Sequence, residues 1–188
     1  MGRFAAAFAT GQAFIDGSGA TSPRDDYHRA ILRDLGLADP PRELLDDLDS
    51  PLDVAVLEPY PEVPSVLDAL LSRGLRLAVV TDNWGTADSV RRLHDQAGLA
   101  GRFEAFVVSQ EVGCNKPDPR IFRAAVDSLG LEPAECLVVD DDPELVAAAI
   151  RLGYEGLAVL RGGTDVASPV PWSRTLTGVL DAVGPPAA

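Results

Sequence analysis

The sequence has few cysteines, few basic residues and no long apolar run, and each shortage excludes a class of protein. Two cysteines, Cys114 and Cys136, are too few for a disulfide framework, so we expect a reducing, cytoplasmic location. The 16 Lys and Arg stand against 29 Asp and Glu, and the net charge of -13 argues against nucleic acid or an anionic membrane as the main partner. No apolar run approaches the roughly 20 residues of a membrane span.

The N-terminus lacks the Leu- or Val-rich core of a signal peptide. Its first residues, MGRFAAAFATGQAF, are Ala-rich with a single Arg, which favours an amphipathic helix. The 188 residues are enough for one domain with a real core, with room for a small accessory unit. Hydrophobic residues make up 46% of the chain and charged residues 24%, which is the balance of an ordinary globular protein.

From about residue 75 the chain alternates short apolar runs with helical patterns. The runs predict four strands, at 75–81, 103–109, 136–140 and 156–162. The segments between them carry helix start and stop signals and predict helices at 86–98, 117–130 and 143–153. This alternation predicts an α/β fold: a Rossmann-like parallel sheet covered by helices on both faces.

The first third of the chain has a different pattern. Segments 22–36 and 40–48 have helix caps, acids in the first turn and apolar residues at helical spacing, and no convincing strand precedes residue 54. We therefore divide the chain into a small helical, cap-like segment at 1–58 and an α/β core at 59–188. Beyond the fourth strand we expect a loop, one short helix and a frayed end.

Polar residues follow three of the predicted strands. Thr81 ends the first, Lys116 follows the second in the loop GCNKPDP, and Asp140 and Asp141 end the third. The carboxyl ends of parallel strands meet at one edge of a sheet, where ligands bind. A hydroxyl and an ammonium can hold phosphoryl oxygens, and carboxylates can hold Mg²⁺, so the set indicates phosphoryl chemistry.

Four blocks of sequence resemble the haloacid dehalogenase-like (HAD) hydrolases. They are YPEVPSVLDALLSRGLRLAVVTDNWG, SQEVGCNKPDPRIF, LGLEPAECLVVDDDPELVAAAIRLGY and GLAVLRG, in the family's order over roughly residues 60–162. The chain looks most like the phosphatase domain of soluble epoxide hydrolases, which also has a Thr-Asn-x-Trp-like second motif and a double Asp in the fourth. The helical N-terminal part resembles that family's cap domain.

The resemblance implies a role for each of these residues. Thr81 matches the residue that binds the phosphoryl group, and Lys116 matches the lysine that neutralises charge on the nucleophile and the phosphoryl group. Asp140 and Asp141 match the acids that hold Mg²⁺. The implied substrate is a small phosphorylated molecule, and a homodimer is an open alternative. The neighbouring Asp82 and Asn83 either line the pocket and contact the substrate or shape the turn.

The sequence departs from the family at its nucleophile. The family uses the first Asp of an Asp-x-Asp at the end of a strand ahead of the cap, and no such strand precedes the helical segment here. The chain's only Asp-x-Asp is formed by Asp47 and Asp49, in RELLDDLDSPL, which fits the acidic end of a cap helix better than a buried strand. The family's later metal-binding acid is also replaced, by Leu145 or Val146.

The remaining candidates have structural explanations. Asp142 precedes Pro143 at a helix start, which predicts a helix cap rather than a metal ligand. Trp84 is expected to pack at the interface with the cap, and the helical settings of His28 and His94 predict solvated residues. Nothing near Cys114 except Lys116 would activate its thiol, so we expect it to be unreactive.

Three functions stay open on this evidence. The first is a Mg²⁺-dependent phosphatase acting through an aspartyl-phosphate, whose first strand is encoded in frame upstream of Met1 as five or six apolar residues and an Asp-x-Asp. The second is a non-catalytic protein that binds a ligand or partner. The third is an enzyme that uses Asp47 and Asp49, or a haloacid dehalogenase-type hydrolase. Without its first strand the sheet is expected to have two open edges that favour aggregation.

Overall fold

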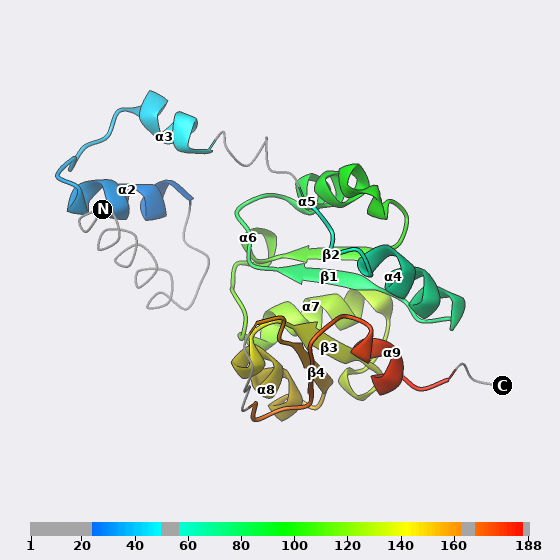
Figure 1. The fold of residues 1–188 in the computed structure, drawn as a ribbon. Helices are drawn as coiled ribbons and strands as arrows, with labels where there is room; N and C mark the ends of the chain where they lie inside the picture. Colours follow the sequence, from blue (N-terminus) through cyan, green and yellow to red (C-terminus); the bar gives the residue numbers. More distant parts are fainter. Residues whose placement is uncertain (1–23, 50–56, 163–167, 186–188) are drawn as a thin grey trace.

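The structure, a computed structural model, describes residues 24–49, 57–162 and 168–185 (Figure 1). Within them, strand β1 (Ala78–Thr81) pairs with β2 (Ala105–Val108), and β3 (Leu137–Asp140) pairs with β4 (Glu155–Val159). Every pairing is parallel, which confirms the predicted α/β class. A fifth strand, β5 (Trp172–Ser173), was missed, because two residues leave no alternation to detect.

The helices that follow the strands form where the capping residues predict. Helix α5 (Ala87–His94) begins at Thr86, whose hydroxyl accepts from the Ser89 N–H, and it continues into the π-helical turn η2 (Asp95–Leu99). Helix α7 (Pro119–Leu129) ends at Gly130, which has a φ of 64° that favours glycine. Helix α8 (Pro143–Arg151) follows β3 directly.

Shorter elements and one further helix complete the core. Helix α4 (Val63–Ser72) precedes β1, and helix α6 (Ser109–Val112) with the 3-10 turn η3 (Pro133–Glu135) flanks α7. The expected short C-terminal helix is α9 (Gly178–Ala182). Among the described residues, no helix is both long enough and apolar enough to cross a bilayer.

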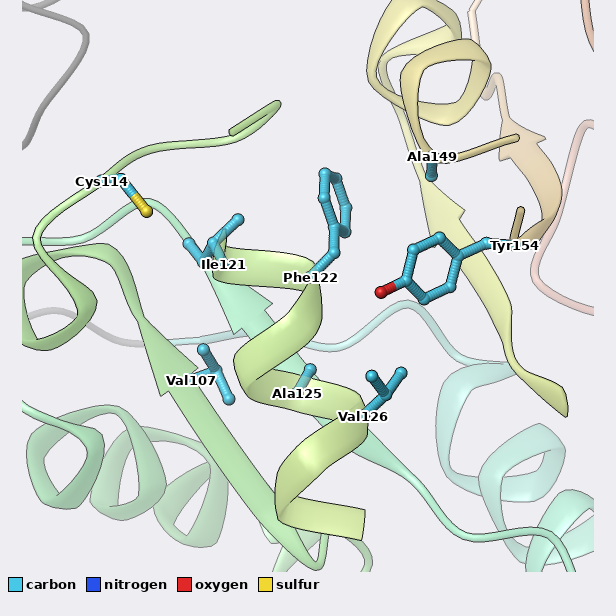
Figure 2. Packing of buried hydrophobic residues seen from close by; sticks show 8 residues of the cluster. All are labelled: Val107, Cys114, Ile121, Phe122, Ala125, Val126, Ala149 and Tyr154. Carbon is cyan, nitrogen blue, oxygen red and sulfur yellow. The ribbon is translucent and has the colours of Figure 1, made fainter. Parts of the chain in front are cut away.

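Apolar side chains pack on both faces of the sheets. One cluster surrounds α7 (Figure 2) and consists of Val107, Cys114, Ile121, Phe122, Ala125, Val126, Ala149 and Tyr154. A second cluster joins α4 and α9 to the opposite face through Leu67, Leu70, Leu157 and Val179, with Leu137 packed against it. Successive residues of β3 serve the two faces, since Leu137 packs on the second cluster and Val138 on the first.

The described strands form two sheets rather than one. The order is β1–β2 in one and β3–β4–β5 in the other, so no described strand pairs with the second edge of β1 or of β3. A cavity of about 670 Å³ lies between them, and its lining includes Ala78 and Val80 of β1 and residues 137–140 of β3. The four predicted strands therefore form, but among the described residues they do not make one continuous sheet.

The N-terminal part is helical where the structure describes it. Helix α2 (Arg24–Asp34) and helix α3 (Arg42–Asp49) are in contact with each other, which confirms the two predicted helices. Asp47 and Asp49 therefore lie in a helix, and the alternative that they end a nucleophile strand is wrong because residues 42–49 form no strand. The amphipathic helix predicted at the start of the chain lies outside the described residues.

Candidate functional site

An ion pair at the carboxyl ends of the strands forms the centre of the candidate site. Lys116 lies in the loop between α6 and α7, and its Nζ is 2.6 Å from Oδ2 of Asp140, the last residue of β3. The two side chains are only 13% and 11% exposed. A charged pair so shielded from water is costly to form and is held in a fixed geometry.

Asp82 fixes the loop that carries this lysine. Its Oδ1 accepts a 3.0 Å hydrogen bond from the backbone N–H of Lys116. Asp82 directly follows β1, so the bond ties the end of one sheet to the loop whose side chain reaches the end of the other. The carboxyl ends of β1 and β3 therefore both lie beside this loop, as the sequence predicted.

The two carboxyl groups have pKa shifts of opposite sign. Burial acts to raise the pKa of Asp140, but the hydrogen bonds from the Lys116 ammonium and the Asp142 N–H outweigh it and the net pKa is lowered. Partial burial of the Asp82 carboxyl group raises its pKa more than the hydrogen bond from the Lys116 N–H lowers it, although the residue as a whole is exposed. The charged form is therefore more strongly stabilised at Asp140 than at Asp82.

The turn after β1 is held by Asn83 and by a buried serine. The Asn83 Oδ1 accepts from the Gly85 N–H at 2.6 Å, and the Asn83 N–H donates to Ser109 Oγ at 3.0 Å. Ser109 is 1% exposed and begins α6. Of the two roles considered for Asn83, these bonds match the shaping of the turn. Ser109 was not singled out from sequence, although a Ser directly after the apolar run FEAFVV was the available signal.

The remaining predicted residues lie around the pair. Thr81 is the last residue of β1 and is half-buried, and Asp141 is exposed beside Asp140. Asp142 caps α8 by accepting from the Glu144 N–H at 2.8 Å, which confirms its predicted role. The structure thus joins Asp82, Lys116 and Asp140 directly and places Thr81 and Asp141 next to them in the chain.

The described residues offer carboxylate oxygens here but no complete metal cage. No group of three or more His, Cys, Asp or Glu side chains within them is placed to hold a metal ion. Val146, one of the two residues at the position of the absent acid, is fully buried in the core. Asp140 and Asp141 still fit Mg²⁺ by donor chemistry, because protein-bound Mg²⁺ is held by one or two carboxylates together with phosphate and water.

Three further predictions can be checked around the site. Trp84 lies edge-on to His28 of α2, with ring centroids 6.0 Å apart, so it packs against the helical segment as expected. The solvated state predicted for both histidines is wrong: each is half-buried. His94 lies edge-on to Phe103 and Phe106, a contact that a helical pattern cannot reveal.

Cys114 has the character expected of an unreactive thiol. It is fully buried in the cluster around α7 (Figure 2), and burial raises its pKa. A raised pKa leaves little thiolate at neutral pH, and the thiolate is the nucleophilic form.

Comparison with known proteins assigns this arrangement to a family. The family model "haloacid dehalogenase-like hydrolase" matches residues 19–153. A phosphatase of Mycobacterium tuberculosis is 31% identical over 165 residues, covering 88% of this chain and 74% of that protein. A phosphoserine phosphatase of Thermus thermophilus is 40% identical over 104 residues, but the match covers 55% of this chain and only 41% of the relative.

A solved structure agrees with this assignment at the level of the fold. An L-2-haloacid dehalogenase superposes with a TM-score of 0.72 at 18% identity, over 96% of this chain and 84% of that one. At that identity the match supports the fold alone, whereas the family match extends over most of the chain. The chain belongs to the haloacid dehalogenase-like hydrolases.

Proposed function

We propose that this chain is the phosphate- and Mg²⁺-binding core of a hydrolase that cleaves phosphate esters of small molecules. The observation that carries the proposal is the shielded Lys116–Asp140 pair at the joined carboxyl ends of β1 and β3. Relatives named phosphoserine phosphatase and phosphoglycolate phosphatase support the substrate class, at 40% and 32% identity. Residues around the site would determine which acid or alcohol the phosphate is attached to in the substrate.

Each residue has a separate task in this proposal. The Lys116 ammonium neutralises part of the charge of a bound phosphate, while Asp82 fixes the backbone position of that lysine. The Thr81 hydroxyl donates to a phosphoryl oxygen. Asp140 and Asp141 would hold Mg²⁺, which supplies positive charge to the phosphoryl oxygens when bound.

The covalent step needs a nucleophilic carboxylate besides those that this proposal assigns to Lys116 and Mg²⁺. In the step implied by the family, a carboxylate oxygen bonds to phosphorus as the ester P–O bond breaks, and the leaving oxygen takes a proton from the second Asp of the family's Asp-x-Asp. Water then hydrolyses the acyl phosphate, which releases phosphate and restores the carboxylate. Both carboxylates that contact Lys116 among the described residues already hold a hydrogen bond, Asp140 to its ammonium and Asp82 to its N–H. The second candidate, a non-catalytic binding protein, needs no such carboxylate, and a measurement of turnover separates it from the first.

The test separates binding from turnover. We expect 10 mM Mg²⁺ with 10 mM inorganic phosphate to raise the thermal midpoint by roughly 5 °C, by mass action, an estimate that takes binding well above Kd. Lys116→Met and Asp141→Asn should each remove most of this rise. Asp142→Ala is the matched control, because it removes an adjacent carboxylate that caps a helix and should lower the midpoint without removing the response.

Two results would contradict the proposal. A midpoint that does not respond, or a response that survives both Lys116→Met and Asp141→Asn, would mean that these residues hold neither ion. A response to 2-chloropropionate without metal would instead favour the dehalogenase-type alternative. The unmodified chain should not hydrolyse 4-nitrophenyl phosphate, since neither Thr81 nor Lys116 can replace a nucleophilic carboxylate.

A further inference from the structure

Helix α6 lies beside the carboxyl ends of β1 and β2, between two parts of the candidate site (Figure 1). It begins directly after β2, and its first residue is Ser109. Thr81 of β1 is paired with Val108 of β2, so both strands leave the sheet one residue later. The loop that follows α6 carries Lys116. The placement of α6 therefore bears on the turn after β1 and on the lysine loop together.

The Ser109 hydroxyl holds the turn after β1 by two hydrogen bonds. Its Oγ accepts from the Asn83 N–H at 3.0 Å and donates to the Asn83 C=O at 3.3 Å. A hydroxyl can donate once and accept twice, so this one side chain satisfies both backbone groups of Asn83. Ser109 is 1% exposed, and a hydroxyl so buried is costly unless it is hydrogen-bonded. The backbone is thereby fixed on both sides of the Asn83 Cα atom.

The turn that Ser109 fixes also holds the lysine loop. The residue before Asn83 is Asp82, whose Oδ1 accepts from the Lys116 N–H at 3.0 Å. At the other end of the lysine side chain, Nζ is 2.6 Å from Oδ2 of Asp140. Ser109 is thus connected to Lys116 by hydrogen bonds through Asn83 and Asp82.

A second connection between the same two residues runs along the chain. Helix α6 has four residues and ends at Gly113, whose φ of 78° lies in the left-handed region that favours glycine. The Gly113 N–H donates to the Ser109 C=O at 2.8 Å. Hydrogen bonds and covalent chain therefore form a closed ring, from Ser109 through Asp82 to Lys116 and back through α6. Because the ring is closed, the backbone position of Lys116 depends on the Ser109 hydroxyl.

The side chain at the end of this ring is the chain's only lysine. Every other basic residue in the sequence, His aside, is an arginine, and the one lysine stands in the loop after α6. A lysine ammonium is carried on a flexible four-carbon stem, so its position is well defined only where its neighbours fix it. A device that holds the Lys116 backbone therefore acts on the one ammonium side chain of the molecule.

We propose that Ser109 is a positioning residue of the site: through Asn83 and Asp82 it fixes where the Lys116 ammonium lies relative to the Thr81 hydroxyl. Ser109 itself does not touch the substrate in this proposal. The effect on bound phosphate rests on the proposed function, whereas the hold on Lys116 rests on the contacts alone.

The single lysine allows a direct measurement on the full 188-residue chain. When the protein is labelled with α-¹⁵N-lysine, the only labelled backbone amide in its NMR spectrum is that of Lys116. Ser109→Ala should speed the exchange of this amide with deuterium roughly tenfold, because the hydrogen bond to Asp82 loses its support. Ser109→Thr keeps the hydroxyl and should bring the rate back to within about twofold of the parent.

Ser89 provides a matched control with the same chemistry. Its Oγ accepts from the Thr86 N–H at 2.9 Å and donates to the Thr86 C=O at 2.8 Å. Ser89→Ala therefore removes the same pair of bonds, but at the residue that caps α5 rather than at the neighbour of Asp82. It should leave the Lys116 exchange rate within about twofold of the parent. Equal acceleration in Ser89→Ala and Ser109→Ala would mean general loosening and would overturn the proposal.

A second variant tests the ring if Ser109→Ala fails to fold. Asp82→Ala removes the next link, the acceptor of the Lys116 N–H, and should speed the exchange of this amide by a similar factor. A folded Asp82→Ala protein whose Lys116 amide exchanges as slowly as in the parent would show that the ring does not hold the lysine, and would overturn the proposal.

Phosphate binding separates this proposal from the proposed function. With saturating Mg²⁺, calorimetry should show that Ser109→Ala raises the Kd for inorganic phosphate roughly tenfold and that Ser109→Thr restores it. If the parent binds no phosphate, the proposed function fails, and the exchange rates of the Lys116 amide still decide the role of Ser109. If folded Ser109→Ala binds phosphate as tightly as the parent and its Lys116 amide is unchanged, the proposed function stands and the positioning role is overturned.

Discussion

Strand β4 and strand β3 are neighbours in one sheet, yet their environments differ. β4 pairs on both sides, with β3 and β5, and its residues from Gly156 to Val159 are all buried. Within the part of the chain that the structure describes, β3 pairs with β4 alone, and none of its residues is fully buried. The two strands are similarly apolar, so the difference comes from the number of partners and teaches that a strand pattern does not guarantee a complete sheet.

The largest expected effect compares the same substitution on these two strands. Leu157→Ala should lower the free energy of unfolding by roughly 2–4 kcal/mol, because it opens a cavity beneath a strand that is enclosed on both sides. Leu137→Ala should cost about 1 kcal/mol less, because Leu137 already borders the cavity between the two sheets. Urea unfolding followed by circular dichroism measures both.

Equal losses in the free energy of unfolding for Leu137→Ala and Leu157→Ala would contradict this prediction. They would show that the edge of β3 that faces the cavity is as well packed in solution as β4. The m values of the two variants should match the parent, since a changed slope would mean that the variants differ in compactness and that the free energies are not comparable.

The second effect concerns the ion pair that joins the two sheets. Lys116→Met and Asp140→Asn should each cost roughly 2–3 kcal/mol, because each leaves the other charge shielded and unpaired. The double variant should cost less than the sum, with a coupling of roughly 2 kcal/mol. Urea unfolding of the four proteins gives the cycle.

An exposed ion pair of similar length is the control. Arg123 and Asp127 are 2.7 Å apart along α7, with side chains 52% and 56% exposed, and their coupling should be below about 0.5 kcal/mol. If the two cycles gave the same coupling, burial would not distinguish the candidate site from a surface pair.

The smallest expected effect concerns the ion pair between Arg161 and Glu62, and it depends on pH. The hydrogen bond from Arg161, which follows β4, is the largest of the effects that together lower the pKa of Glu62 at the start of α4. The carboxylate therefore adds stability above its unfolded pKa, about 4.3, and the gain is lost as pH falls through the lower folded value. Between pH 6 and pH 3, the parent should lose slightly more stability than Glu62→Gln.

This pH dependence has a direct control in its partner. The thermal midpoint of the double variant, Arg161→Met with Glu62→Gln, should change with pH in the same way as that of Glu62→Gln alone. A parent curve that coincides with the Glu62→Gln curve would show that the pair contributes nothing measurable in solution.

Local patterns were sufficient for much of this fold. The apolar runs predicted four strands, and the caps and glycines predicted helices α5, α7 and α8 at nearly their observed bounds. Asp142 was identified as a cap because the residues that decide it, Pro143 and Glu144, are its neighbours in the chain. The roles given to the site residues and to Mg²⁺ remain predictions; these residues are Thr81, Asp82, Asn83, Lys116, Asp140 and Asp141.

The sequence alone determined which residues form strands and helices and which polar groups end the strands, because these depend on neighbours within a few positions. Only the tertiary structure decided that Asp82 holds the Lys116 backbone, that His94 packs against two phenylalanines, and that β1 and β3 face each other across a cavity. Those contacts join residues far apart in the chain, and their free energy comes from packing and desolvation in three dimensions, which no local pattern contains.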